Sequence, residues 1–104
     1  MGNLIFTSGQ IPADPASGEI VPGGVDAQTR QALKNLEEVL NAAGTKSDNV
    51  LKTTLFIKDM DDFAAINEIY ASFFGTKSPA RSCIEAARLP KDVLIEIEAI
   101  AYIP

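Results

Sequence analysis

The end of the chain reads SPARSCIEAARLP (residues 78–90) and then VLIEIEAI (residues 93–100), and these two runs decide the fold. Both are short, and the second is rich in β-branched and apolar residues, which favours strands over helices. The Leu-Pro-Lys-Asp sequence at residues 89–92 predicts a short turn between them. The chain is therefore expected to end in two strands of one sheet.

Charged and reactive side chains occupy alternate positions in these two strands. Side chains two residues apart on a strand point to the same face. Arg81 and Cys83 therefore share one face, as do Glu96 and Glu98. A carboxylate inside such an apolar strand costs free energy unless a partner pairs with it or water reaches it. This cost makes a functional site in this region the leading interpretation.

Four further elements are expected upstream. Apolar periodicity predicts strands over residues 4–7 and 49–59 and helices over residues 25–43 and 61–74. Gly44 and Gly75 end the two helices. In the strand over 49–59, the alternation places one set of side chains on a common face: Leu51, Thr53, Leu55 and Ile57. The predicted order is β-α-β-α-β-β in an α+β fold of one domain, residues 1–104.

The last strand predicts a second subunit. Its first face is wholly apolar and suits the side covered by the helices: Val93, Ile95, Ile97, Ala99, Ala101 and Ile103. Its second face mixes carboxylates with large apolar groups: Leu94, Glu96, Glu98, Ile100 and Tyr102. Two helices can cover only one face of a four-stranded sheet. We therefore expect the second face to pack in a closed homo-oligomer, with Glu96 at or near the subunit boundary.

Composition narrows the chemistry. The 104 residues are 46% hydrophobic and 22% charged, with a net charge of −5, which argues against nonspecific nucleic-acid binding. The single cysteine excludes an internal disulfide and a multi-cysteine zinc site. The absence of histidine excludes Ser-His and Cys-His catalysis and His-ligated zinc. No apolar run is long enough to span a membrane, and no secretory signal is visible, so a cytoplasmic location is expected.

Several stretches together resemble one protein family. They read GNLIFTSGQIP (residues 2–12), QTRQALKNL (28–36), VLKTTLFIKDM (50–60) and DFAAIN (62–67), and they are completed by residues 79–99. This pattern resembles the Rid (reactive intermediate deaminase, YjgF-type) proteins, sometimes labelled translation initiation inhibitors. The resemblance covers nearly the whole chain.

The resemblance implies a chorismate-mutase-like α+β fold with both helices on one face of the sheet. It also implies a homotrimer with a central barrel and clefts between subunits. The implied activity is the hydrolysis of 2-imino or enamine acids, such as 2-aminoacrylate, to 2-keto acids and ammonia. Neither a cofactor nor a metal is implied, and the partners implied are a small imino or keto acid and two further copies of the chain.

The family pattern also assigns roles to residues. Arg81 is implied to hold the substrate carboxylate, and Glu96 to handle the attacking water. Cys83 and the Ser8-Gly9 turn are implied to line the cleft, with Asn67 as a lesser candidate.

Two departures from the family pattern stand out. Family members usually begin earlier, with an Ala-Pro…Gly-Pro-Tyr-Ser-Gln segment that supplies a strand and a cleft tyrosine; this sequence begins at Met1 without it. The connection over residues 75–78 is short and lacks an aromatic residue before Pro79. We expect these differences to affect affinity and substrate preference.

Simpler interpretations of the same residues remain open. Arg81 could form a structural ion pair with Glu96 or Glu98, and Glu96 could pair across the subunit boundary. Cys83 could be a small buried residue or, with its pKa lowered by Arg81, a nucleophile. Ser8-Gly9 could be only a strand-end turn, and Asn67 a local cap. At the level of function, the alternatives are a noncatalytic trimeric module that binds small carboxylates or a protein, and an RNA-directed nuclease or translation inhibitor.

Overall fold

Two α-helices and four strands form the fold of the protein in the computed structural model, which describes residues 2–104. They are strand β1 (Leu4–Phe6), helix α1 (Gly24–Ala42), strand β2 (Val50–Ile57), helix α2 (Phe63–Phe74), strand β3 (Ala80–Glu85) and strand β4 (Ile95–Tyr102). The predicted order and the α+β class are confirmed. β3 ends at Glu85, well before the end of the run that predicts it.

The four strands form one sheet in the order β1-β4-β2-β3. β4 lies antiparallel to both β1 and β2, whereas β3 lies parallel to β2 at one edge. The turn predicted at residues 89–92 is present as a 3-10 turn, Pro90–Asp92, but it does not form a hairpin. The crossover through α2 places β3 on one side of β2, so β4 pairs on the other side and the two final strands never touch as neighbours.

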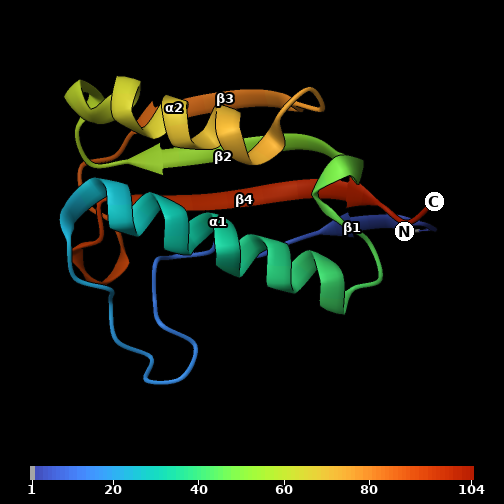
Figure 1. Ribbon diagram of the computed structural model, residues 1–104, viewed down its shortest axis with the longest axis horizontal. Coiled ribbons are helices and arrows are strands. Elements are labelled where there is room, and N and C mark those ends of the chain that lie inside the picture. The colour runs from blue at the N-terminus through green and yellow to red at the C-terminus, as the bar shows by residue number, and fades with distance from the viewer. Residues whose placement is uncertain (1) are drawn as a thin grey trace.

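Both helices cover the same face of the sheet (Figure 1). The core between the two layers contains Leu36 and Leu40 of α1, Ile66 of α2, and a set of strand residues that are at most 3% exposed: Leu55, Ile57, Ile95, Ile97, Ala99 and Ala101. The predicted inner face of the last strand is therefore confirmed for Ile95, Ile97, Ala99 and Ala101, whereas Ile103 lies beyond the end of β4 and is half-buried. Burying this apolar set is the main force that holds the helices on the sheet.

The predicted face of β2 is wrong at one position. The pairing of β2 with β4 shifts between Val50 and Lys52, as in a β-bulge. The shift turns Val50 into the core at 6% exposure and leaves Leu51 48% exposed. Beyond it, the alternation resumes as predicted with Thr53, which is fully buried.

The face of the sheet opposite the helices, here called the open face, carries exposed apolar side chains. Phe6 is 63% exposed and Ile84 is 49% exposed. Phe6 is paired with Ile100 of β4, and Ile84 with Phe56 of β2. Nothing in residues 2–104 covers this face, so its predicted burial against other subunits remains a prediction.

Candidate functional site

Arg81 lies on the helix-covered face of the edge strand β3. It is paired with Thr53 of β2, whose side chain points into the core, so the Arg81 side chain points toward α2. Its Nη1 donates a hydrogen bond of 2.7 Å to Oδ1 of Asn67. The guanidinium carbon also lies 4.7 Å from the ring centre of Tyr70 and 5.3 Å from that of Phe63. Cation–π contacts at these distances favour the charged group in this position.

Three residues of α2 therefore contact the Arg81 side chain and hold it in place. Phe63, Asn67 and Tyr70 are spaced i, i+4 and i+7, which places them on one side of the helix. Asn67 is thus brought to Arg81, in keeping with its candidacy. Phe63 and Tyr70 are missing from the sequence-based site because their apolar spacing indicates core packing. Their helical spacing from Asn67 is the signal that links them to the arginine.

The Tyr70 side chain is itself fixed by a hydrogen bond to β2. Its hydroxyl lies 2.7 Å from Oγ1 of the buried Thr53, and burial raises the pKa of the tyrosine above its ordinary value, outweighing the hydrogen bond and the positive charge of Arg81. The ring is therefore a neutral, rigid platform. It holds the guanidinium without neutralising it.

The charge of Arg81 has no acidic partner in the described part of the chain, since no carboxylate of residues 2–104 lies within 4.0 Å of its guanidinium. An ion pair with Glu96 or Glu98 in the same chain is therefore wrong as an explanation of this arginine. Beside it lies a cavity of about 270 Å³ lined by Asn67, Tyr70, Ala71, Ser78, Pro79 and Arg81. An arginine fork next to such a space is suited to binding a small carboxylate.

Cys83 follows Arg81 on the same face and is half-buried against the core. Burial raises the pKa of the thiol, and the nearby Arg81 charge only partly opposes this rise. The net direction is opposite to the one that the nucleophile hypothesis requires, because a reactive cysteine needs its thiolate form. The structure favours Cys83 as a wall residue beside Arg81.

Glu96 lies on the open face, in the middle of the sheet. It pairs with Phe56 of β2 and is half-buried, whereas Glu98, two residues further on, is exposed. The carboxylate of Glu96 rests directly on Gly9, where a Cβ would overlap it. Gln10 holds the neighbouring backbone in register, since it exchanges two hydrogen bonds with Ile97. The fold thus brings Gly9, which the resemblance implies to line the cleft, to Glu96.

The candidate residues form two groups that do not meet within one chain. Arg81, Cys83 and Asn67 lie on the helix-covered side of β3. Glu96 and Gly9 lie on the opposite face, since Glu96 pairs with Phe56 while Arg81 pairs with Thr53, and these two β2 residues point to opposite faces. One chain therefore contains two halves of a candidate site rather than a complete one.

The described part of the chain contains neither a candidate metal site nor a helix that could span a membrane. Residues 2–104 contain no group of three or more His, Cys, Asp or Glu side chains placed to hold a metal ion. Neither of the two α-helices in this range is both long enough and apolar enough to cross a membrane.

Comparison with known proteins identifies the family. The family model described as endoribonuclease L-PSP matches residues 1–103. A RutC family protein of Pyrococcus horikoshii is 57% identical over 97% of this chain and 80% of its own length. The 2-iminobutanoate/2-iminopropanoate deaminase of Escherichia coli K12 is 56% identical over the same shares.

The fold comparison agrees with the sequence comparison. The crystal structure of E. coli TdcF with bound serine matches with a TM-score of 0.92 at 50% identity, covering 98% of this chain and 82% of that one. The shared sequence and fold extend over the whole sheet and both helices. The chain therefore belongs to the endoribonuclease L-PSP family, which is the Rid or YjgF-type family that its motifs resemble.

Proposed function

We propose that this protein hydrolyses small 2-imino acids, and the enamine acids in equilibrium with them, to 2-keto acids and ammonia. The observation that carries the proposal is the Arg81 guanidinium, which is held by Asn67 and two aromatic rings and has no acidic partner among the residues that the structure describes. The name of the E. coli relative supports the same reaction class. The serine in the TdcF structure, a small amino acid with a free carboxylate, supports a ligand of this size.

Arg81 would bind the carboxylate of the substrate. Its Nη1 already donates to Asn67, which leaves the other N–H groups of the guanidinium for the two carboxylate oxygens. Such charged hydrogen bonds contribute about 1.5–3 kcal/mol each. The rings of Phe63 and Tyr70 restrict the rotation of the Arg81 side chain, so little further ordering is needed when the acid binds.

Glu96 would act on the water molecule. Its carboxylate accepts a proton as the water oxygen bonds to C2 of the imine, and the C=N bond becomes a C–N single bond. The same carboxylate then returns the proton to the nitrogen. The product of this step is a carbinolamine. A second transfer through the carboxylate then moves the hydroxyl proton to the amine nitrogen, so that ammonia leaves as the C–N bond breaks and the keto group forms, and no oxidant or reductant is consumed.

The complete site requires a second copy of the chain. Arg81 and Glu96 lie on opposite sides of the sheet, so a neighbour must present its Glu96 to the Arg81 cavity. The apolar side chains of the open face, among them Phe6, Ile84 and Leu4, support an assembly through this face. We propose the closed homotrimer that the family resemblance implies, with one site in each cleft between subunits.

The decisive test measures pyruvate formation from freshly generated 2-aminoacrylate. A pyridoxal-phosphate-dependent dehydratase supplies this enamine, and the protein should accelerate pyruvate appearance above the spontaneous rate. Arg81→Ala should lower kcat/KM by about 10–100-fold, because a charged hydrogen-bond donor is lost. Arg88→Ala is the matched control, since Arg88 is exposed and pairs with Asp92. Unchanged activity in Arg81→Ala would refute the proposal.

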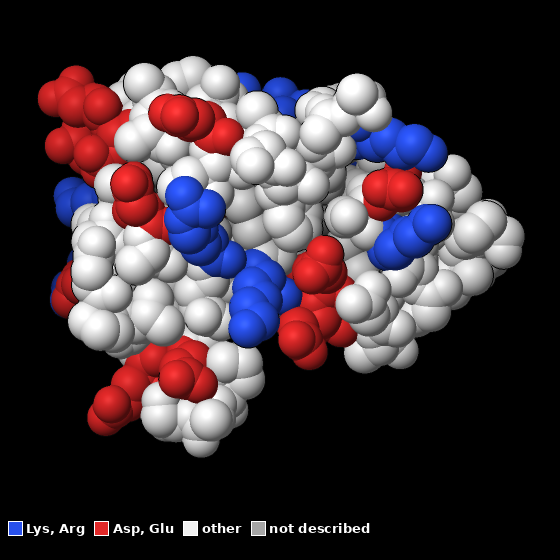
Figure 2. Space-filling model, in the orientation of Figure 1, with Lys and Arg blue, Asp and Glu red and all other residues white. Residues whose placement is uncertain are grey.

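The name of the family model also raises the possibility of RNA cleavage. Figure 2 shows acidic and basic side chains interspersed over the helix side of the molecule, with no continuous basic area there. Together with the net charge of −5, this distribution favours a small acid over a polyanion as ligand. Cleavage of RNA by highly purified protein, abolished by one point mutation, would instead favour the nuclease function.

A further inference from the structure

The segment that carries Gly9 lies between β4 and α1. On one side, Gln10 exchanges backbone hydrogen bonds of 2.7 and 3.0 Å with Ile97. On the other side, the following residues pass alongside α1, where Pro12 is buried and Ile11 and Ala13 are half-buried. The position of Gly9 against Glu96 thus depends on how this segment is held from both sides.

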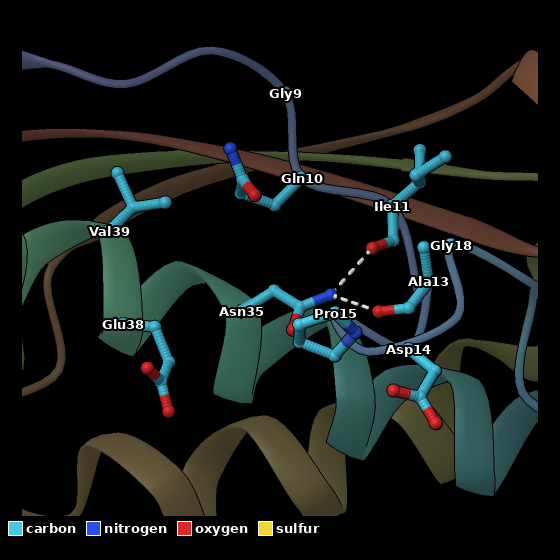
Figure 3. A pocket seen from close by; sticks show the side chains of 10 residues that line it. All are labelled: Gly9, Gln10, Ile11, Ala13, Asp14, Pro15, Gly18, Asn35, Glu38 and Val39. Carbon is cyan, nitrogen blue, oxygen red and sulfur yellow. Dashed lines mark hydrogen bonds between the residues drawn. The ribbon is translucent and has the colours of Figure 1, made fainter.

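Asn35 of α1 makes the connection on the helix side (Figure 3). Its Nδ2 donates to the carbonyl oxygens of Ile11 at 3.0 Å and Ala13 at 2.8 Å. Its Oδ1 accepts a hydrogen bond of 2.8 Å from Nε2 of Gln31, one helical turn earlier. This last bond fixes which end of the amide faces the segment. Both N–H groups of the amide are therefore directed at backbone carbonyls.

The packing around Asn35 does not replace these bonds. Pro12 of the segment is fully buried, but an open cavity of about 370 Å³ lies between other parts of the segment and α1, lined by Gly9, Gln10, Ile11 and Ala13 on one side and by Asn35, Glu38 and Val39 on the other. Side chains therefore fill only part of the space between segment and helix. Within residues 2–104, the two Asn35 bonds are the hydrogen bonds that join residues 9–20 to α1.

We propose that Asn35 is a positioning residue for catalysis: by holding Ile11 and Ala13 on α1, it keeps Gly9 against the carboxylate of Glu96. This inference rests on the proposed deaminase function. Asn35 touches neither Glu96 nor Arg81, so it acts only through the backbone of residues 9–13. Loss of the Asn35 amide should therefore affect the half of the site that contains Glu96, which acts on the water, and leave the half that contains Arg81 intact.

The test compares Asn35→Asp with Asn41→Asp. Both changes replace an amide by a carboxylate on α1, but Asn41 is exposed and its side chain makes no hydrogen bond within residues 2–104. Asn35→Asp loses both donors and directs a negative oxygen at two carbonyls. We expect kcat to fall at least about tenfold, because displacement of a catalytic group by about 1 Å can cost about 100-fold in rate. The Kd for pyruvate, which reports the Arg81 half, should stay within about twofold of the control.

Amide hydrogen exchange gives a readout that does not depend on activity. The Gln10 amide, which donates to Ile97, should exchange at least about tenfold faster in Asn35→Asp, while the Leu55 amide in the centre of the sheet should not change. Asn35→Ala, which removes the donors without adding charge, should behave in the same way if Asn35→Asp folds poorly.

The outcomes separate the two proposals. If the wild-type protein hydrolyses 2-aminoacrylate and Asn35→Asp retains the kcat of Asn41→Asp, the positioning role is overturned. If both variants fold and Gln10 exchange is unchanged, it is overturned as well. If the wild-type protein shows no turnover, the deaminase proposal fails and the catalytic role of Asn35 fails with it. In that case, faster Gln10 exchange would still show that the amide holds the segment.

Discussion

At the scale of single residues, Gly9 shows how a position without a side chain can serve a site. The carboxylate of Glu96 occupies the space that a Cβ at residue 9 would need. A glycine there permits close approach of backbone and carboxylate. This contact joins residues 87 positions apart, so no local pattern in the sequence could reveal it. The resemblance implies that the Ser8-Gly9 turn lines the cleft, but the contact of Gly9 with Glu96 is a result of the structure.

Cys83 offers a prediction on pH dependence. Burial raises the pKa of this thiol above its ordinary value of 9.0, while Arg81 opposes the rise. Because the thiolate is the form that reacts with iodoacetamide, the rate of alkylation should reach half its maximum above pH 9.0. Arg81→Ala should move this midpoint to still higher pH, since it removes the positive charge that favours the thiolate.

The measurement is the rate of carboxamidomethylation by mass spectrometry as a function of pH. Arg88→Ala, an arginine exchange at an exposed position, should leave the midpoint unchanged. A midpoint that falls when Arg81 is removed would contradict the electrostatic effect of Arg81 on this thiol.

At the scale of elements, much of the fold follows from local patterns. The period-2 alternation in β4 correctly predicts which of its side chains enter the core, because one face of the strand is uniformly apolar. The helices can be predicted equally well from their apolar spacing and their terminal glycines. What local patterns cannot supply is the order of strands, since the short link from β3 to β4 is compatible with a hairpin as well as with the observed passage around β2.

The register shift in β2 is a second feature that the alternation of side chains along this strand does not predict. Leu51 and Leu55 are identical residues on one strand, four positions apart, and simple alternation assigns both to the core. The irregular pairing between Val50 and Lys52 exposes Leu51 and leaves Leu55 buried. A bulge of this kind depends on the partner strand, so it cannot be predicted from β2 alone.

This difference predicts unequal costs for the same substitution. Leu55→Ala should lower the free energy of unfolding by about 2–5 kcal/mol, because it leaves a cavity in a packed core. Leu51→Ala should cost less than about 1 kcal/mol, as exposed substitutions usually do. Urea unfolding at one fixed protein concentration measures both values. Similar losses for the two variants would contradict the register assigned to β2.

At the scale of the whole molecule, the central fact is that Arg81 and Glu96 face opposite sides of one sheet. The alternation within each strand correctly predicts which residues share a face. It cannot predict whether the Arg81 face of β3 and the Glu96 face of β4 are the same, because that depends on the register of both strands with β2. The division of the candidate site into two halves is therefore a result of the structure.

This division predicts complementation between two inactive variants. Arg81→Ala retains a working Glu96, and Glu96→Gln retains a working Arg81. Mixed trimers, formed by co-expression and isolated from the unmixed ones, should recover up to about a third of wild-type activity, since one of their three subunit clefts receives one intact half from each variant.

The experiment measures pyruvate formation from 2-aminoacrylate after tagging each variant and isolating oligomers that carry both tags. The separately purified variants, combined without exchange of subunits, serve as the control. Absence of recovery in verified mixed oligomers would show that both groups act within one chain and would overturn the composite site.

A site shared between copies also makes catalysis sensitive to dilution. A chain that is alone would hold a guanidinium without a carboxylate opposite it. Turnover per chain should consequently decline once the protein concentration falls below the dissociation constant of the assembly. The amount of protein present would thus set not only how many catalysts a solution contains, but what fraction of its chains can work at all.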